Sequence, residues 1–194
     1  MRLLNTATLM LEEFFDKKPP YAILSHTWGS EEVAFADLQG ERSLLEDKSG
    51  YKKVKGCCAI ARNDDFDWVW IHTCCIDKTS SAELSEAINS MFQWYQEAVI
   101  CYAYLIDVPH LKYAIFLAHE NLRNSNQEMA SVFDKEKTMF TGSRWFSRGW
   151  TLQELLAPRN IVFFATDWSC IGTKEELAEL IEKSTGITRL ALQK

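Results

Sequence analysis

The chain has 194 residues and a mass of 22.4 kDa, which suits one domain of ordinary size. Hydrophobic residues make up 47% and charged residues 25%, so the chain can bury a core and lacks the composition of a disordered protein. Its formal net charge of −6 argues against nucleic acid or an acidic membrane surface as a partner, because phosphate binding on that scale needs a basic face. Seven tryptophans need either a large core or a functional site.

The sequence predicts a cytoplasmic protein without a membrane span. No stretch approaches the ~20 uninterrupted apolar residues of a transmembrane helix, and Glu12 and Glu13 interrupt the apolar N-terminus, which makes it a poor export signal. The cysteines include two adjacent pairs, and none has the spacing of a zinc finger. We therefore expect buried thiols in a reducing compartment and no metal site. The six cysteines are Cys57, Cys58, Cys74, Cys75, Cys101 and Cys170.

Strand and helix patterns alternate along the chain. Four short runs rich in β-formers predict buried strands, at 21–25, 68–73, 99–105 and 161–165. Helical periodicity covers 51–63 and 80–95, and Ser80 with Glu83 has the spacing of a capping box at the start of the second helix. A similar pair opens a last helix at 173–186, which a glycine ends. This alternation predicts an α/β fold with a mainly parallel sheet and helices on both faces.

Two segments fall outside this alternation. The stretch from His110 to Gly142 is polar, lacks a strand pattern and has a helical tendency over 111–122. We expect it to be an insertion at one edge of the sheet, away from the chemistry. The last residues, 188–194, carry no stop signal, and we expect them to begin a linker to further domains.

Ligands of an open parallel sheet bind beyond the carboxyl ends of the strands, and this rule selects the loops that follow the predicted strands. The residues in these loops that are candidates to meet at one rim are Ser25, His26, Asp77, Arg144, Arg148 and Glu154. Each also has a structural interpretation. Ser25 and His26 suit a capped strand end, and Asp77 supplies the negative charge favoured before a helix.

A local cluster of basic and aromatic residues stands out in this acidic chain. Arg144 and Arg148 flank Trp145, Trp150 follows, and Glu154 lies at the edge of an apolar stripe. This combination suggests an anionic ligand with a ring that can stack, and the alternative is a structural Arg–Glu network.

Three ordered blocks, 21–29, 68–78 and 143–155, resemble the signature blocks of the fungal heterokaryon-incompatibility (HET) domain. The resemblance implies one domain over 1–187, interrupted by the variable insertion at 110–142. His72 departs from the family pattern, which usually has aspartate after Trp-Ile. Members of this family act in programmed cell death when unlike fungal cells fuse. They commonly precede a nucleotide-binding oligomerisation module and a repeat sensor.

A more distant resemblance is to the Toll/interleukin-1-receptor (TIR) domain, which has a flavodoxin-like sheet. Residues 147–155 are similar to the TIR helix Ser-x-x-Trp-Cys-Leu-x-Glu-Leu, with Thr151 in place of the cysteine. This similarity implies that Glu154 is catalytic and that the chain cleaves the nicotinamide–ribose bond of NAD when it self-associates. NAD would be a substrate, and no cofactor is implied.

The chemistry is consistent with a single carboxylate. Nicotinamide in NAD is already positively charged and leaves without the general acid that other glycosides need, so one carboxylate can stabilise the oxocarbenium-like transition state. The arginines are expected to hold the diphosphate, and a tryptophan is expected to cover a ring. The residues expected to bind substrate are Ser25, His26, Thr27, Trp28, Gly29, Asp77, Arg144, Trp145, Arg148 and Trp150.

Two other functions stay open at this point. One is a death-signalling adaptor that acts only by binding other proteins. The other is a cysteine hydrolase in which Cys74 or Cys75 works with His72, because His72 and Cys74 share one face of the predicted strand.

Overall fold

A seven-stranded sheet forms the centre of the computed structural model, which describes residues 1–111 and 127–192. The spatial order of the strands is β2-β1-β4-β3-β5-β6-β7. The strands are β1 Arg2–Asn5, β2 Leu11–Glu13, β3 Ala22–His26, β4 Trp68–Ile71, β5 Ile100–Tyr104, β6 Ile161–Phe164 and β7 Cys170–Thr173. β4, β3, β5 and β6 are mutually parallel, whereas β1, β2 and β7 pair antiparallel at the two sides. The predicted mainly parallel sheet is therefore confirmed.

The four parallel strands have a flavodoxin-like order. Numbered among themselves along the chain, they run 2-1-3-4, which is the start of the flavodoxin order 2-1-3-4-5. The chain steps from β3 to β4 in one direction and then crosses back over β3 to β5. Right-handed crossovers in opposite directions place their helices on opposite faces of the sheet. The switch point between β3 and β5 is where such sheets open a crevice.

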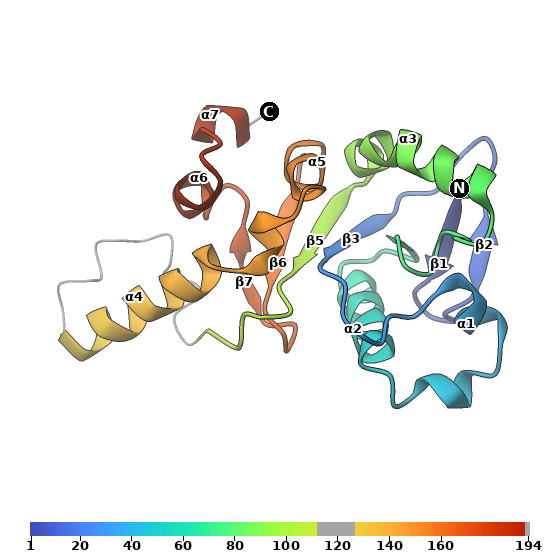
Figure 1. The fold of residues 1–194 in the computed structure, drawn as a ribbon, viewed down its shortest axis with the longest axis horizontal. Helices are drawn as coiled ribbons and strands as arrows, with labels where there is room; N and C mark the ends of the chain where they lie inside the picture. The colour runs from blue at the N-terminus through green and yellow to red at the C-terminus, as the bar shows by residue number, and fades with distance from the viewer. Residues whose placement is uncertain (112–126, 193–194) are drawn as a thin grey trace.

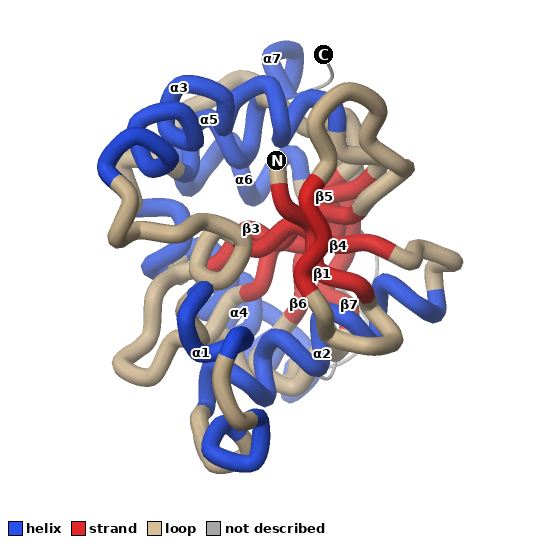
Figure 2. Tube along the Cα trace, turned by 90° about the vertical axis from the view of Figure 1, so that its right-hand side faces the viewer, coloured by secondary structure: helices blue, strands red, loops and turns tan. Residues whose placement is uncertain are grey.

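Figure 2 shows these two helical layers, with α3, α5 and α6 on one side of the strands and α1 and α2 on the other. The α-helices are α1 Phe35–Gln39, α2 Ser49–Asn63, α3 Ser81–Glu97, α4 Gln127–Thr141, α5 Thr151–Leu156, α6 Ala178–Thr185 and α7 Arg189–Leu192. Two 3-10 helices are η1 Arg42–Leu45 and η4 Arg144–Ser147. The predicted helices 51–63 and 80–95 correspond to α2 and α3.

The structure differs from the sequence prediction at both sides of the sheet. The hairpin β1–β2 and the strand β7 were not predicted. Thr173 ends β7 and does not begin a helix, and α6 starts only at Ala178. The amide of Glu176 still donates to Thr173 Oγ1 at 3.2 Å, so the predicted pair closes the turn between strand and helix. The strand β4 ends at Ile71, so His72 and Cys74 lie beyond it. The prediction that these two residues share a strand face is therefore wrong.

The predicted insertion contains the 15-residue helix α4. In Figure 1 this helix extends away from the sheet, and one end of it lies next to α6. Phe133 and Phe140 on α4 are buried against the rest of the molecule. The helical tendency predicted over 111–122 lies, apart from Leu111, outside the described residues.

The core lies on both faces of the sheet. All five residues of β3 are buried, and so are the side chains of Trp70 and Trp145. Five of the six cysteines are buried as expected, but Cys170 is exposed at the edge strand β7, so that part of the prediction is wrong. Within the described part of the chain, no helix has the length and apolarity needed to cross a membrane.

Candidate functional site

A carboxylate, a hydroxyl, an indole and a guanidinium meet beyond the carboxyl end of β3. Ser25 Oγ donates to Glu154 Oε2 at 2.6 Å and accepts a hydrogen bond from Trp145 Nε1 at 2.7 Å. Arg148 donates from Nη1 to Glu154 Oε2 at 3.1 Å and from Nη2 to Oε1 at 3.2 Å. Glu154 is only 2% exposed, so its charge depends on this paired guanidinium and on the serine.

The chain around residues 143–154 folds so that both Trp145 and Glu154 reach Ser25. Asp107, just after β5, accepts from Ser143 Oγ at 2.7 Å and fixes the start of η4. The hydroxyl of Thr151 donates to the backbone carbonyl of Trp145, which ties α5 to η4. Glu154 lies one turn into α5 and therefore faces the sheet beside Trp145.

Rings stack next to this cluster. The His26 ring is fully buried and stacks on His72, with 4.4 Å between ring centroids. Trp28 also stacks on His72, with 5.4 Å between ring centroids. Lys78 Nζ lies 3.6 Å from the centroid of the Trp28 ring. These four residues, His26, His72, Trp28 and Lys78, are called the stacked column below. The column runs from the core to the surface.

The inner end of the column is neutral and poorly hydrogen-bonded. Burial lowers the pKa of His26 to about 4 and that of His72 well below its ordinary value, so both imidazoles are uncharged at neutral pH. Both ring nitrogens of His26 and Nε2 of His72 are buried without a hydrogen-bond partner among the described residues. Glu32 Oε2 lies 3.6 Å from His26 Nε2, and Glu32 Oε1 pairs with Lys53 Nζ at 2.5 Å.

A cavity of about 260 Å³ opens between the stacked column and α3. Its polar and aromatic lining consists of Trp28, His72, Lys78, Arg148, Trp150 and Glu154. The opposite wall is apolar and consists of Ile76, Leu84, Ile88 and Met91. Trp28 and Trp150 are 52% and 50% exposed, so both rings have a free surface beside the cavity. An apolar hollow with a few convergent polar groups is typical of a small-molecule site.

The structure brings most of the predicted site residues to this place. Trp28, Arg148, Trp150 and Glu154 line the cavity, while Ser25 and Trp145 support Glu154 from beneath and His26 lies behind His72. The predicted site residues that lie elsewhere are Thr27, Gly29, Asp77 and Arg144.

Those four residues have other surroundings. Gly29 lines a second cavity, of about 290 Å³, on the α2 side of the sheet. The Asp77 carboxylate accepts from Thr79 Oγ1 at 2.7 Å. Arg144 extends into solvent, with its Nε 3.6 Å from Asp107. Thr27 is partly buried and lines neither cavity.

Comparison with known proteins settles the family of this chain. The sequence pattern described as "Heterokaryon incompatibility protein (HET)" matches residues 21–154. The chain belongs to the heterokaryon incompatibility family. The "Vegetative incompatibility protein HET-E-1" of Podospora anserina is 43% identical over 179 residues, which cover 91% of this chain and 12% of that relative. No solved structure matches the chain, so the TIR resemblance stays a prediction.

Sequence reasoning missed five residues that line the cavity of this HET domain: Ile76, Lys78, Leu84, Ile88 and Met91. It considered His72, which also lines the cavity, only as the partner of a cysteine nucleophile. A signal was present in α3. Its apolar stripe is wider than its buried face: Ala87 and Tyr95 are buried, Leu84 and Met91 pack only partly buried against the core, and Ile88 is 43% exposed. An apolar stripe that exceeds the buried face indicates a groove beside the helix.

The cysteines are poorly suited to nucleophilic chemistry. The hydrogen bond with Cys75 and burial both raise the pKa of the Cys74 thiol well above its ordinary value, so the thiolate is disfavoured. Neither Cys74 nor Cys75 lines the cavity that contains His72. Across residues 1–111 and 127–192, no group of three or more His, Cys, Asp or Glu side chains is placed to hold a metal ion.

Proposed function

We propose that this HET domain is the death-inducing effector of a heterokaryon incompatibility protein and that it cleaves the nicotinamide–ribose bond of NAD. The role in incompatibility rests on the family and on the name of the relative from Podospora anserina. The observation that carries the chemistry is a buried, oriented carboxylate, Glu154, at the wall of a cavity lined by two half-exposed tryptophan rings.

Glu154 is the proposed catalytic residue. Its Oε2 already accepts from Ser25 and Arg148, whereas Oε1 accepts only from Arg148 among the described residues. A carboxylate oxygen has two lone pairs, so Oε1 retains an acceptor position for a ribose hydroxyl. The negative charge beside the ribose then stabilises the positive charge that develops at C1′.

The reaction needs only water as a second reactant. The bond between ribose C1′ and the nicotinamide nitrogen breaks, and its electron pair leaves with nicotinamide as a neutral molecule. Water adds to C1′ and loses a proton to solvent, which gives ADP-ribose. Ser25 and Arg148 hold the carboxylate in one orientation, so it needs no rearrangement when the charge develops.

The size of the cavity bears on how the enzyme is activated. Its 260 Å³ is smaller than the ~300–1,000 Å³ of pockets that enclose a drug-sized ligand, so it accommodates the nicotinamide–ribose end and leaves the rest of NAD at the rim. Trp28, Ile88 and Trp150 are exposed beside it. A second copy seated on these side chains would enclose the rest of the ligand, and the proposed activity therefore depends on self-association.

Nicotinamide release tests the proposal. The purified chain is incubated with NAD, alone and fused to a module that forces clustering, and free nicotinamide is measured by chromatography. We expect release on clustering and its loss in Glu154→Gln, with Glu179→Gln on the exposed face of α6 as the charge-matched control. Circular dichroism must show that Glu154→Gln folds. Release that persists in folded Glu154→Gln would exclude the catalytic role of Glu154.

The exposed apolar side chains beside the cavity also favour a second candidate function, that of a non-catalytic adaptor that binds another death-signalling protein. The two functions differ in a cell-based assay. Cell death that survives Glu154→Gln with unchanged NAD levels would support the adaptor, and so would the absence of nicotinamide release in every clustered form.

A further inference from the structure

The geometry points to Lys78 as the residue that binds a ligand phosphate at the open side of the cavity, with the Trp28 ring as the platform that holds its side chain. Naming the phosphate as part of a nicotinamide nucleotide rests on the proposed function. The observations at Lys78 do not involve the chemistry of Glu154.

The two arginines expected to hold a diphosphate are both engaged elsewhere. Arg144 points into solvent near Asp107 and does not line the cavity. Arg148 lines the cavity, but two of its guanidinium nitrogens are bonded to Glu154. A phosphate that took Arg148 would leave a buried carboxylate without its counter-ion, which is costly.

Lys78 is the cation at this cavity that has no acidic partner. No carboxylate of the described residues lies within ion-pair distance of its Nζ, and the neighbouring Asp77 is turned to Thr79. Partial desolvation of its side chain lowers the pKa of Lys78, so part of its hydration is already lost although the residue is exposed. An anionic group that approached it would restore the missing counter-charge.

The charges around the cavity leave one positive charge unbalanced. Arg148 and Glu154 compensate each other. His72 is neutral, because burial and the nearby charges of Lys78 and Arg148 lower its pKa. An uncompensated positive charge on a protein with a formal net charge of −6 favours an anionic ligand at this position over the rest of the surface.

The stacked column fixes where this charge lies. Trp28 rests on His72, and the Lys78 ammonium lies over its outer face at 3.6 Å from the centroid, a cation–π contact. Glu154 is buried at the inner wall, whereas Lys78 is exposed at the outer one. A nicotinamide nucleotide carries its phosphate on C5′ of the same ribose whose C1′ would lie at Glu154. From the inner wall of the cavity to the outer wall, the proposed order is therefore the Glu154 carboxylate, the ribose, the phosphate and the Lys78 ammonium.

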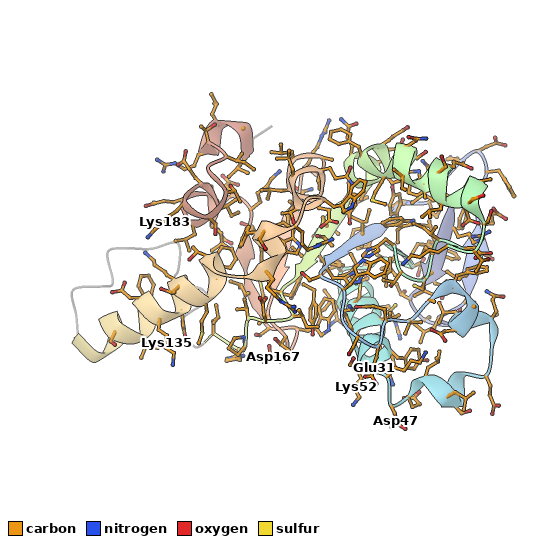
Figure 3. The ribbon with its side chains drawn as sticks, in the orientation of Figure 1. Glu31, Asp47, Lys52, Lys135, Asp167 and Lys183 are labelled. Atoms are coloured by element: carbon orange, nitrogen blue, oxygen red, sulfur yellow. The ribbon has the colours of Figure 1, made fainter. Side chains whose placement is uncertain are left out.

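Two ligands that differ by one phosphate test this assignment. Binding of nicotinamide mononucleotide and of nicotinamide riboside is measured by calorimetry for the wild-type chain, Lys78→Met and Lys78→Arg. We expect Lys78→Met to bind the mononucleotide about tenfold or more weakly, since a lost charged hydrogen bond has that effect, and to bind the riboside as the wild type does. Lys78→Arg should retain most of the wild-type affinity for the mononucleotide. Lys183→Met is the charge-matched control, because Lys183 lies on α6, which is on the same side of the sheet as α3 but toward the opposite end of the molecule (Figures 1 and 3).

The outcomes separate this inference from the proposed function. Equal weakening of both ligands in Lys78→Met would overturn the inference and assign Lys78 to the shape of the cavity. No measurable binding of the mononucleotide to the wild type would overturn it as well. If the mononucleotide binds through Lys78 while no nicotinamide is ever released from NAD, the inference stands and the proposed reaction fails. If NAD is cleaved and Lys78→Met leaves KM unchanged, the reaction stands and the inference fails.

Discussion

Ser25 and His26 are neighbours on β3, yet they belong to two buried polar clusters that differ in hydrogen bonding. Ser25 joins Trp145, Arg148 and Glu154, and the hydroxyl, the indole nitrogen and both carboxylate oxygens there have partners. His26 has none for either ring nitrogen among the described residues. Successive side chains of a strand face opposite sides, so one step along the chain separates a satisfied cluster from an unsatisfied one.

The difference shows how the two clusters remain stable in the same core. The Ser25 cluster keeps its charges because donors and acceptors match. Both rings of the histidine pair are neutral because burial lowers their pKa values. The two rings contact each other by stacking. The free energy of unfolding should therefore fall when the Ser25 cluster loses a partner. It should also fall when the histidine pair is exposed to low pH.

The largest effect is expected when the cation of the satisfied cluster is removed. Arg148→Ala leaves the Glu154 carboxylate buried with only Ser25 as a donor, and breaking a buried ion pair costs about 3–5 kcal/mol of unfolding free energy. Urea unfolding measures this cost. The double variant Arg148→Ala with Glu154→Gln should recover much of it. A single variant that loses less than about 1 kcal/mol would show that Glu154 does not depend on its counter-ion.

The next largest effect is the pH dependence of the unsatisfied cluster. The unfolded chain protonates His26 near its ordinary pKa of about 6.5, whereas the folded chain resists protonation until about pH 4. The unfolded state thus binds more protons in this window. The free energy of unfolding should fall by about 3 kcal/mol as the pH drops from about 6.5 to 4. His72 acts in the same direction, and the charged groups that face His26 are Glu32, Lys53 and Arg148.

Urea unfolding at several pH values measures this loss of stability. His26→Gln should flatten the pH dependence in this window. His110→Gln should not, because His110 is exposed beside Asp167 and has no comparable burial. A slope between pH 6.5 and 4 that is the same in wild type and His26→Gln would show that the histidine is not held neutral.

A smaller effect is expected from the hydroxyl that links the satisfied cluster to the sheet. Ser25→Ala removes a donor to Glu154 and leaves the buried Trp145 indole nitrogen without its acceptor, which costs about 1–3 kcal/mol. Ser147→Ala is the matched control, because its hydroxyl is exposed, and it should change stability by less than about 0.5 kcal/mol. Equal effects of the two substitutions in thermal unfolding would contradict the network.

Much of the fold could be predicted because strong local patterns coincide with long elements. The four parallel strands are short runs of β-formers, and α3 begins where Ser80 accepts from the amide of Glu83 at 3.3 Å. The Glu83 side chain behaves differently from a capping box, because it pairs with Arg2 and accepts from the amide of Asp77. A partner 81 residues away in the sequence determined this contact, and no local spacing contains that information.

The site was predictable only where contacts are close in the sequence or where a strand end dictates them. Arg148 and Glu154 are only six residues apart, so a short local segment brings the two side chains together. By contrast, Arg144 looks equivalent to Arg148 in the sequence, and only the 3-10 geometry of η4 turns it to Asp107. The place of Lys78 depends on its contact with Trp28, 50 residues earlier, which no sequence pattern indicates.

The hairpin at the start of the chain has a practical consequence for how clustering can be imposed. The α-amino group of Met1 donates to the carbonyl of Phe14 at 3.0 Å, and the amide of Phe14 donates back to Met1 at 2.8 Å. A tag or fusion partner added ahead of Met1 replaces that ammonium with an amide beside the β1–β2 hairpin. The α7 end of the chain lies apart from this hairpin in Figure 1, so an inducible oligomerisation module is better attached after α7.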